Sequence, residues 1–173
     1  IRRVDSPRKN MLNEAKLLKI VNKINVGPKF IKNSKNFLIM EYIKGEKIID
    51  WAKKPETKAK EIRLIVNQVL RACYRLDDVG LDHGELSTID KHVIINEKRN
   101  TIIDFESSSL NRKTSNVSGA TQAIFIGTGL AKIIRKKIKV STKKKIIELI
   151  RAYKKNPTLE TFESLLVGLK LKT

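Results

Sequence analysis

The sequence contains few cysteine, proline, glycine and aromatic residues and no long apolar run. Its 173 residues include one cysteine, Cys73, four prolines and eight glycines, and aromatic residues make up 5%. A single cysteine cannot form an internal disulfide, which excludes a disulfide-stabilised scaffold. The low proline and glycine contents exclude a collagen-like fibre and a low-complexity linker. No apolar segment approaches the roughly 20 residues that cross a bilayer.

Acidic residues are also scarce relative to basic ones. The chain has 37 Lys and Arg against 18 Asp and Glu, a formal net charge of +19. Hydrophobic residues make up 40% of it, enough to form a core, so we expect a folded domain and not a disordered tail. The lone cysteine and the lack of a secretory leader at the start of this sequence favour a reducing, cytoplasmic location without membrane association.

The sequence begins with Ile1 and not with Met, so we expect this residue to lie in the middle of a domain. Two amphipathic helices are predicted after it. The first covers residues 8–25 and stops at Gly27-Pro28, and the second covers residues 57–79 and stops at Gly80. The apolar stripe of the second helix is formed by Ile62, Ile65, Val66, Val69, Cys73 and Leu76.

Short β segments separate and follow these helices. Residues 29–32 and 37–42 are predicted strands, and the second is too apolar to alternate, so we expect it to be buried. Residues 92–95 and 101–105 flank a polar turn and predict a β-hairpin. Residues 43–46, with Gly45, are expected to be a connector.

The last third of the chain has a helical pattern. Helices are predicted over residues 119–139 and 142–154, and a last helix begins near residue 156. Asn156 or Thr158 can cap this last helix, and Pro157 fits its first turn. No internal repeat and no long linker divides the chain.

A specific order of parts carries the functional information. The second long helix runs into His83-Gly84-Glu85, then a hairpin follows, and its second strand ends in Asp104-Phe105-Glu106. This order resembles the protein-kinase-like fold, with its His-Arg-Asp or His-Gly-Asp catalytic loop and its Asp-Phe-Gly-type triplet. The strings at 82–87, 91–94 and 102–107 are most similar to predicted archaeal Ser/Thr protein kinases. These are distantly similar to RIO and tRNA-threonylcarbamoylation-complex kinases and to aminoglycoside phosphotransferases.

The resemblance covers essentially the whole chain and implies an α+β, protein-kinase-like fold. Residues 1–43 would be a truncated or minimal N-terminal lobe, with a helix, antiparallel strands and a hinge. Residues 44–173 would be a mainly helical C-terminal lobe that holds the catalytic-loop hairpin and basic C-terminal helices. The implied activity is ATP- and Mg²⁺-dependent phosphoryl transfer, as in an atypical Ser/Thr protein kinase with a protein substrate.

The resemblance also assigns roles around the metal. Asp104 would be the metal ligand, Glu85 would hold the catalytic-base position, and His83 would brace the loop through hydrogen bonds. Counting along the loop makes Asp90 the second metal ligand, whereas aligning the strand makes it His92. Hard cations prefer oxygen, so Asp90 is the more plausible ligand and His92 is expected to be an ordinary strand residue.

The nucleotide site would lie further upstream. Glu14 matches the helix glutamate that pairs with an ATP-orienting lysine, Met40 matches the gatekeeper, and Glu41 to Ile43 match the hinge that reads adenine. The sequence contains neither that lysine nor a Gly-rich phosphate-covering loop, and we expect both to precede Ile1.

Departures from the family pattern leave a second reading open. Glu85 replaces the usual Asp, and Glu106 replaces Gly, as in a pseudokinase-like module that has kept the fold for binding. Basic residues concentrate at 2–35 and 132–145 and produce a positive field suited to the phosphates of RNA or a ribonucleoprotein. The sequence does not indicate the phosphoacceptor, the oligomeric state or whether the chain is catalytically active.

Overall fold

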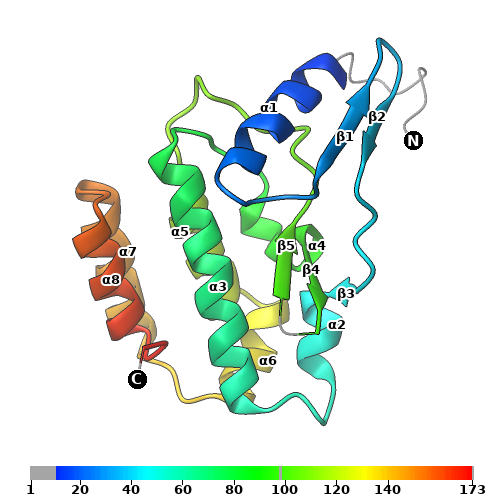
Figure 1. Ribbon diagram of the computed structural model, residues 1–173. Helices are drawn as coiled ribbons and strands as arrows, with labels where there is room; N and C mark the ends of the chain where they lie inside the picture. Colours follow the sequence, from blue (N-terminus) through cyan, green and yellow to red (C-terminus); the bar gives the residue numbers. More distant parts are fainter. Residues whose placement is uncertain (1–10, 98, 173) are drawn as a thin grey trace.

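Residues 11–97 and 99–172 are described by the computed structural model. They form an α+β arrangement of one N-terminal helix, two small antiparallel sheets and a mostly helical remainder, and helices α2, α3 and α4 come between the strands of the second sheet (Figure 1). The predicted fold class is therefore confirmed. The start of the helix expected from residue 8 lies outside the described residues.

Helix α1, Met11–Lys23, packs against the two-stranded sheet of β1, Phe30–Asn33, and β2, Leu38–Met40. The side chain of Asn22 fixes the turn between the helix and the sheet. Its Nδ2 donates to the carbonyls of Val26 and Pro28, at 3.1 and 2.9 Å, and its Oδ1 accepts from the Phe30 amide at 2.7 Å. The order of helix and strands thus agrees with the prediction.

The prediction that residues 37–42 are buried is wrong. Only Leu38 of this segment is in the core, at 4% exposure, whereas Ile39 is 44% exposed and Tyr42 is 87% exposed. The sheet has two strands among the described residues, and one side of it packs on α1. The apolar run reflects β propensity and does not mean that both faces are covered.

A second sheet links the chain after β2 to the predicted hairpin. The two-residue strand β3, Glu46–Lys47, pairs antiparallel with β4, Val93–Asn96, which pairs with β5, Arg99–Ile102. The hairpin is confirmed. Strand β3 and the six-residue helix α2, Ile48–Lys53, were not predicted, because such short elements show no readable period.

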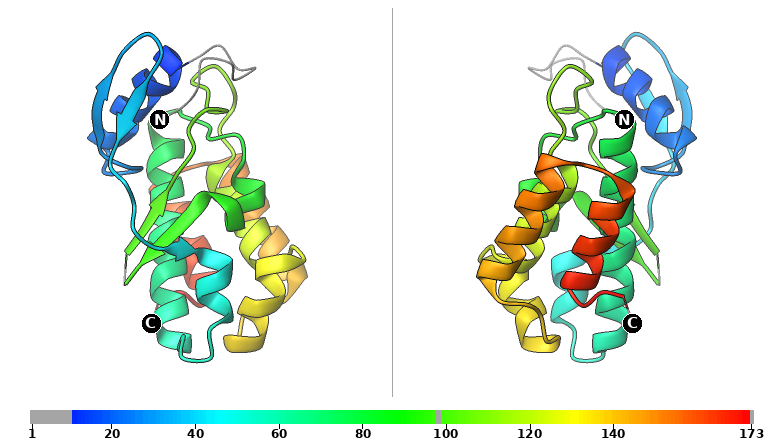
Figure 2. Two further views of the ribbon diagram at one scale, coloured as in Figure 1. Left: turned by 90° about the vertical axis from the view of Figure 1, so that its right-hand side faces the viewer. Right: turned by 90° about the vertical axis from the view of Figure 1, so that its left-hand side faces the viewer.

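Helix α3, Ala59–Asp78, is the central element of the molecule. All six members of its predicted apolar stripe are at most 1% exposed, and the chain leaves the helix through Gly80 at φ 72°. In two perpendicular views, α3 lies between the β4–β5 hairpin and the C-terminal helices (Figures 1 and 2). The turn η1, Leu86–Thr88, and helix α4, Ile89–His92, come between α3 and β4.

The helix predicted over residues 119–139 is two helices. Helix α5 is Asn116–Phe125 and helix α6 is Gly129–Lys137, and they are bent by 65° at the break. Glycines at 127 and 129 lower the helix propensity there. No single helix among the described residues is long and apolar enough to cross a membrane, although the bent α5–α6 pair passes that test jointly.

Each of the last two helices is capped at its N-terminus by a threonine. Helix α7, Lys143–Lys155, is capped by Thr142, whose hydroxyl accepts from the Lys145 amide. Helix α8, Leu159–Gly168, is capped by Thr158, so Pro157 precedes the cap and does not lie in the first turn. Buried apolar side chains from α1 to α8 belong to one continuous cluster.

Asp77, near the end of α3, joins three helices. Its Oδ1 accepts from the backbone amide and the Nδ2 of Asn116, at 3.0 and 2.8 Å. Its Oδ2 accepts from the Val117 amide at 3.2 Å and from the Tyr153 hydroxyl at 2.9 Å. Asp77 thereby caps α5 from another helix, and burial raises the pKa of its carboxyl group despite these hydrogen bonds.

Candidate active site

The loop after α3 is tied to the segment that follows β5. Asp82 and Ser109 exchange two backbone hydrogen bonds of 2.9 Å. The buried carboxylate of Asp82 also accepts from the Ser115 amide at 2.9 Å and from Arg112 Nε at 2.5 Å. These contacts hold the His83-Gly84-Glu85 loop against residues 107–115.

Gly84 is required by this close approach. It has φ 90°, and a Cβ on it would lie 2.5 Å from Nη2 of Arg112 and 2.9 Å from the Ser107 carbonyl. That Nη2 donates to the Ser107 carbonyl at 3.0 Å. Arg112 therefore closes over the loop, a positioning role that the sequence did not reveal because the residue lies in a polar, irregular segment.

His83 is fully buried and braces the loop from inside. Its backbone amide donates to Asn116 Oδ1 at 2.8 Å, and its Nε2 lies 3.1 Å from the carbonyl oxygen of Ile103. Its ring meets those of Phe105 and His92 edge-on, with centroids 5.0 and 5.4 Å away. The ring thus connects the loop with the end of the hairpin.

Asp104 lies at a sharp turn after β5. Its φ is 69°, in the left-handed region, which Asp and Asn adopt more readily than other residues with a side chain. Phe105 then enters the core at 2% exposure, and its ring lies so close to Gly27 that a Cβ there would be 2.8 Å from it. The turn leaves Asp104 exposed while Phe105 anchors it.

Three side chains from separate segments converge here. Ligand atoms of Glu85, His92 and Asp104 all lie within 4.8 Å of one another. Glu85 Oε1 accepts from the Ser107 hydroxyl at 2.7 Å, and its Oε2 lies 3.3 Å from His92 Nε2. The extra methylene of Glu85, compared with Asp, lets its carboxylate reach across to His92 and Asp104.

The structure brings His92, and not Asp90, to this cluster. His92 ends α4 and is 6% exposed, so it is not the strand residue that the sequence suggested. Two residues along a helix differ by about 200° in direction, so Asp90 faces elsewhere. It lines a hollow together with Ala123 and Gly127. Counting residues along the loop selected Asp90 because the count did not take helix α4 into account.

The donor set fits a divalent cation. Two carboxylates and an imidazole suit such ions, whose bonds to oxygen and nitrogen are about 2.1 Å long, so a small contraction of the cluster would bring all three into reach. Imidazole nitrogen is more typical of sites for transition metals such as Mn²⁺ than of Mg²⁺ sites. Asp104 and Glu85 supply the oxygen ligands that either metal accepts.

The residues assigned to the nucleotide lie on the first sheet and helix. Glu14 is on α1 at 9% exposure, and Met40 ends β2 at 36% exposure. Glu41 Oε2 accepts from the Lys29 amide at 3.1 Å, and Ile43 is half-buried in the connector. None of the four belongs to the Glu85, His92 and Asp104 cluster, and their roles toward ATP stay predictions.

Protonation of His83 is expected to make the free energy of unfolding depend on pH. Burial lowers the pKa of His83 below 6.5, opposed by the Ile103 carbonyl contact and by the charges of Asp104 and Glu85, while His92 lowers it further. The unfolded chain therefore takes up the proton at a higher pH than the folded protein. We expect the free energy of unfolding to fall as the pH decreases from about 6.5 toward the folded-state pKa.

Urea unfolding at pH 7.5, 6.5 and 5.5 checks this expectation. His83→Gln keeps an amide that can donate to the Ile103 carbonyl but does not titrate, so its stability should decline less over this range. An equal decline in both proteins would assign the pH dependence to other groups.

Comparison with known proteins finds a matching family model and a similar protein. The family model described as the RIO domain matches residues 4–116, a stretch that contains all three clustered side chains. An uncharacterized protein of Methanocaldococcus jannaschii is 32% identical over 120 residues, which cover 67% of this chain and 99% of that protein.

Proposed function

The chain belongs to the RIO-domain family of kinase-like, ATP-binding phosphotransferases, and from this premise we propose that it transfers phosphate from ATP to a Ser or Thr hydroxyl of a protein. The convergence of Glu85, His92 and Asp104 within 4.8 Å carries this proposal. Phosphoryl transfer depends chiefly on positioning and charge neutralisation, which a compact group of metal-binding side chains can provide.

Asp104 is the principal metal ligand in this proposal, and His92 takes the place of Asp90 as a further ligand. A bound divalent cation would neutralise charge on the ATP phosphates. Glu85 would have two roles: its Oε2, which lies 3.3 Å from His92 Nε2, would help to hold the cation, and its Oε1 would orient the acceptor hydroxyl. Oε1 accepts from Ser107, and a carboxylate oxygen can accept more than one hydrogen bond. His83 and Arg112 keep the loop in place.

The first helix and sheet would bind the nucleotide. The backbone from Glu41 to Ile43 would read the adenine edge next to Met40. Glu14, held at 9% exposure on α1, would orient the lysine that contacts the phosphates. Phe105 packs next to Gly27, just after α1, and so couples this half of the site to the metal ligands.

A thermal-shift titration of the protein tests the site directly. A ligand that binds only the folded state stabilises it by RT ln(1 + [L]/Kd), about 2.7 kcal/mol at 100 times Kd. We expect ATP with Mg²⁺ to raise the melting temperature, and ATP with Mn²⁺ to do so at a lower metal concentration because of His92. Asp50→Asn, at an exposed position on α2, is the control and should keep the full shift.

A binding module for RNA is the second candidate function. Exposed lysines gather from α6 to the start of α7, namely Lys132, Lys136, Lys139, Lys143, Lys144 and Lys145, of which Lys145 is paired with Glu148. Arg135 and Lys137 in the same stretch donate to backbone carbonyls, which occupies part of their hydrogen-bonding capacity but leaves their positive charges in place. RNA binding that weakens steeply with salt, without any thermal shift from ATP and metal, would favour this alternative.

A further inference from the structure

The hydroxyl group of Ser107 contacts the carboxylate that the proposed function assigns to the acceptor. Its Oγ donates to Glu85 Oε1 at 2.7 Å, and both residues are half-buried. A base takes a proton from a hydroxyl group at about 2.6–3.2 Å between the two heavy atoms. Relative to Glu85, Ser107 therefore lies where an acceptor of phosphate has to lie.

The other oxygen of the same carboxylate belongs to the metal-binding cluster. Glu85 Oε2 lies 3.3 Å from His92 Nε2, and ligand atoms of Glu85, His92 and Asp104 all lie within 4.8 Å of one another. Ser107 follows Asp104 by only three residues. Phosphates held at this cluster would therefore lie close to the Ser107 hydroxyl.

The two serines that follow Ser107 have different partners. Ser108 is 7% exposed, and its hydroxyl lies 3.4 Å from the carbonyl oxygen of His83. The hydroxyl of Ser109 accepts from the Asn111 amide at 3.1 Å. Of these three consecutive serines, Ser107 is the one whose hydroxyl contacts Glu85.

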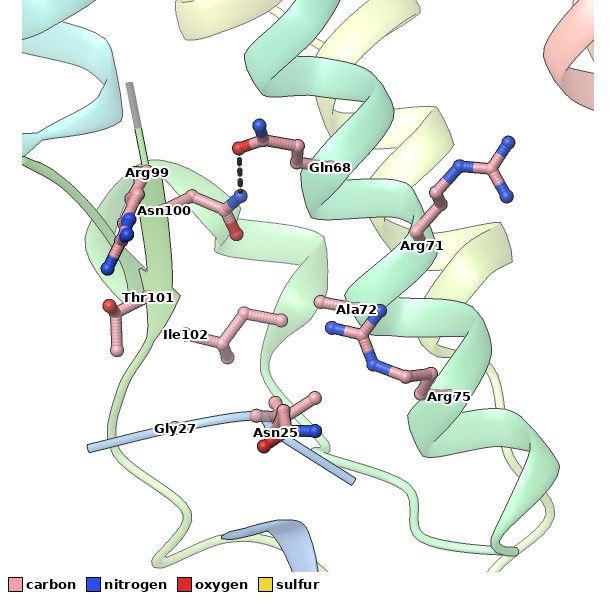
Figure 3. Close-up of a pocket in the computed structure, with 11 residues that line it drawn as sticks. Asn25, Gly27, Gln68, Arg71, Ala72, Arg75, Arg99, Asn100, Thr101 and Ile102 are labelled. Carbon is pink, nitrogen blue, oxygen red and sulfur yellow. Dashed lines mark hydrogen bonds between the residues drawn. The ribbon is translucent and has the colours of Figure 1, made fainter. Parts of the chain in front are cut away.

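Thr101 provides a comparison on the other side of Asp104, because it precedes Asp104 by three residues. It lies next to Arg99 on β5 and lines a cavity between the hairpin and α3 (Figure 3). Neither Asp104 nor another member of the cluster is among the residues that line this cavity. Proximity to Asp104 in the sequence thus does not by itself place a hydroxyl group against Glu85.

Arg112 provides a positive charge for a phosphate at this position. Its Nη2 donates to the Ser107 carbonyl at 3.0 Å, whereas its Nη1 makes no hydrogen bond to the described residues. A phosphoserine carries about 1.5 to 2 negative charges, and its three oxygens pair readily with guanidinium groups. Arg112 would therefore offset part of the repulsion between the new phosphate and the carboxylates of Glu85 and Asp104.

We propose that Ser107 is a phosphorylation site that the chain modifies in cis, within its own active site. This inference rests on the proposed phosphotransferase function and names one acceptor for it. The Ser107 Oγ attacks the γ-phosphorus of ATP and forms a new O–P bond. The bond from that phosphorus to the oxygen that it shares with the β-phosphorus breaks, ADP leaves with the electron pair, and the Oγ proton passes to Glu85 Oε1.

The modified side chain affects later turnovers. A phosphate on Ser107 lies against Glu85 Oε1, the oxygen that would orient the hydroxyl of a protein substrate. The acceptor position is then occupied by a negatively charged group. Phosphorylation of Ser107 therefore slows transfer to other proteins, so that the chain limits its own activity.

Incubation of the full-length protein with ATP and Mg²⁺ or Mn²⁺, followed by mapping of the phosphate by mass spectrometry, tests the proposal. We expect phosphate on Ser107, at a rate per chain that is independent of protein concentration. Ser107→Ala should reduce the phosphate incorporated about tenfold or more, because it removes the attacking hydroxyl. Ser109→Ala and Thr101→Val remove hydroxyl groups that do not contact Glu85 and should stay within about twofold of the unchanged protein.

Two further measurements show that the loss in Ser107→Ala is specific. ATP with metal should raise the melting temperature of this variant as it does for the unchanged protein, because Ser107 is not a member of the metal-binding cluster. Prior incubation with ATP should slow transfer to a protein substrate in the unchanged protein but not in Ser107→Ala. If Ser107→Ala does not fold, Ser107→Thr keeps a hydroxyl group, and phosphothreonine at position 107 would support the same assignment.

The outcomes separate this inference from the proposed function. Transfer to a protein substrate without phosphate on Ser107 would overturn the inference and leave the proposed function in place. No transfer to either acceptor would overturn both. A rate per chain that rises with protein concentration would show modification between molecules and would contradict the reaction in cis.

Discussion

Replacing Asp104 by Asn is expected to reduce ATP-dependent phosphoryl transfer on the order of 10³-fold or more, equivalent to about 4 kcal/mol of transition-state stabilisation. The substitution removes the negative charge of the principal metal ligand and keeps the size of the side chain. Asn also tolerates the left-handed backbone that Asp104 adopts at φ 69°. Phe105 should therefore stay anchored, and the free energy of unfolding should change little.

Transfer of radiolabelled phosphate to a protein substrate, measured with Mg²⁺ and with Mn²⁺, checks this result. Asp90→Asn makes the same chemical change at a carboxylate that lines a separate hollow, and we expect its rate to stay within about threefold of the unchanged protein. Glu85→Gln should slow transfer by about 10²- to 10⁴-fold, because it removes the group that orients the acceptor hydroxyl.

The outcomes of these variants distinguish the assignments. Retained activity in Asp104→Asn would remove the metal site from the proposal. Retained activity in Glu85→Gln alone would remove only the role of Glu85 toward the acceptor. A larger loss in Asp90→Asn than in His92→Ala would restore Asp90 as the second ligand, against the position of His92 in the cluster.

The largest loss of stability is expected from Asp77→Ala. The carboxylate of Asp77 accepts hydrogen bonds from Asn116, Val117 and the Tyr153 hydroxyl, which join α3, α5 and α7. Removing it leaves buried donors unsatisfied and uncaps α5, so we expect the free energy of unfolding to fall by about 3 kcal/mol. Urea denaturation measures this change.

Asp78→Ala provides the matched control, because Asp78 is the next residue and is exposed. Its effect should stay within about 0.5 kcal/mol. Since burial raises the Asp77 pKa above 3.8, the stability contribution of this group declines as the pH rises from 3.8 through the folded-state pKa, and Asp77→Ala should lose that dependence. A loss below about 1 kcal/mol would show that Asn116 and Tyr153 find other partners.

Elements with long, regular patterns were predictable from the sequence. The stripe on α3 spans four turns and is buried as expected, and α7 begins next to the threonine that caps it. Short elements such as β3 and α4 were not predicted, because two to four residues carry no period. The exposure of Ile39 and Tyr42 was also missed, because apolarity does not report which faces a neighbour covers.

The residues of the site can also be divided into those that the sequence identified and those that it missed. The motifs identified Glu85 and Asp104, and these two carboxylates do converge. His92 joins them because α4 changes the path of the loop, and counting residues could not anticipate that helix. Arg112 and Asp77 were missed altogether, because their roles depend on partners about 30 to 76 residues away in the chain.

The sequence by itself determined the fold class, the main helices and hairpin, the family resemblance and the excess positive charge. Periodicity and motif order are local properties of the chain, so they can be read without coordinates. The tertiary structure decided which side chains meet: His92 with Glu85, Arg112 over Gly84, and Asp77 with Asn116 and Tyr153. These groupings depend on how distant segments pack, and packing is settled by the whole core at once.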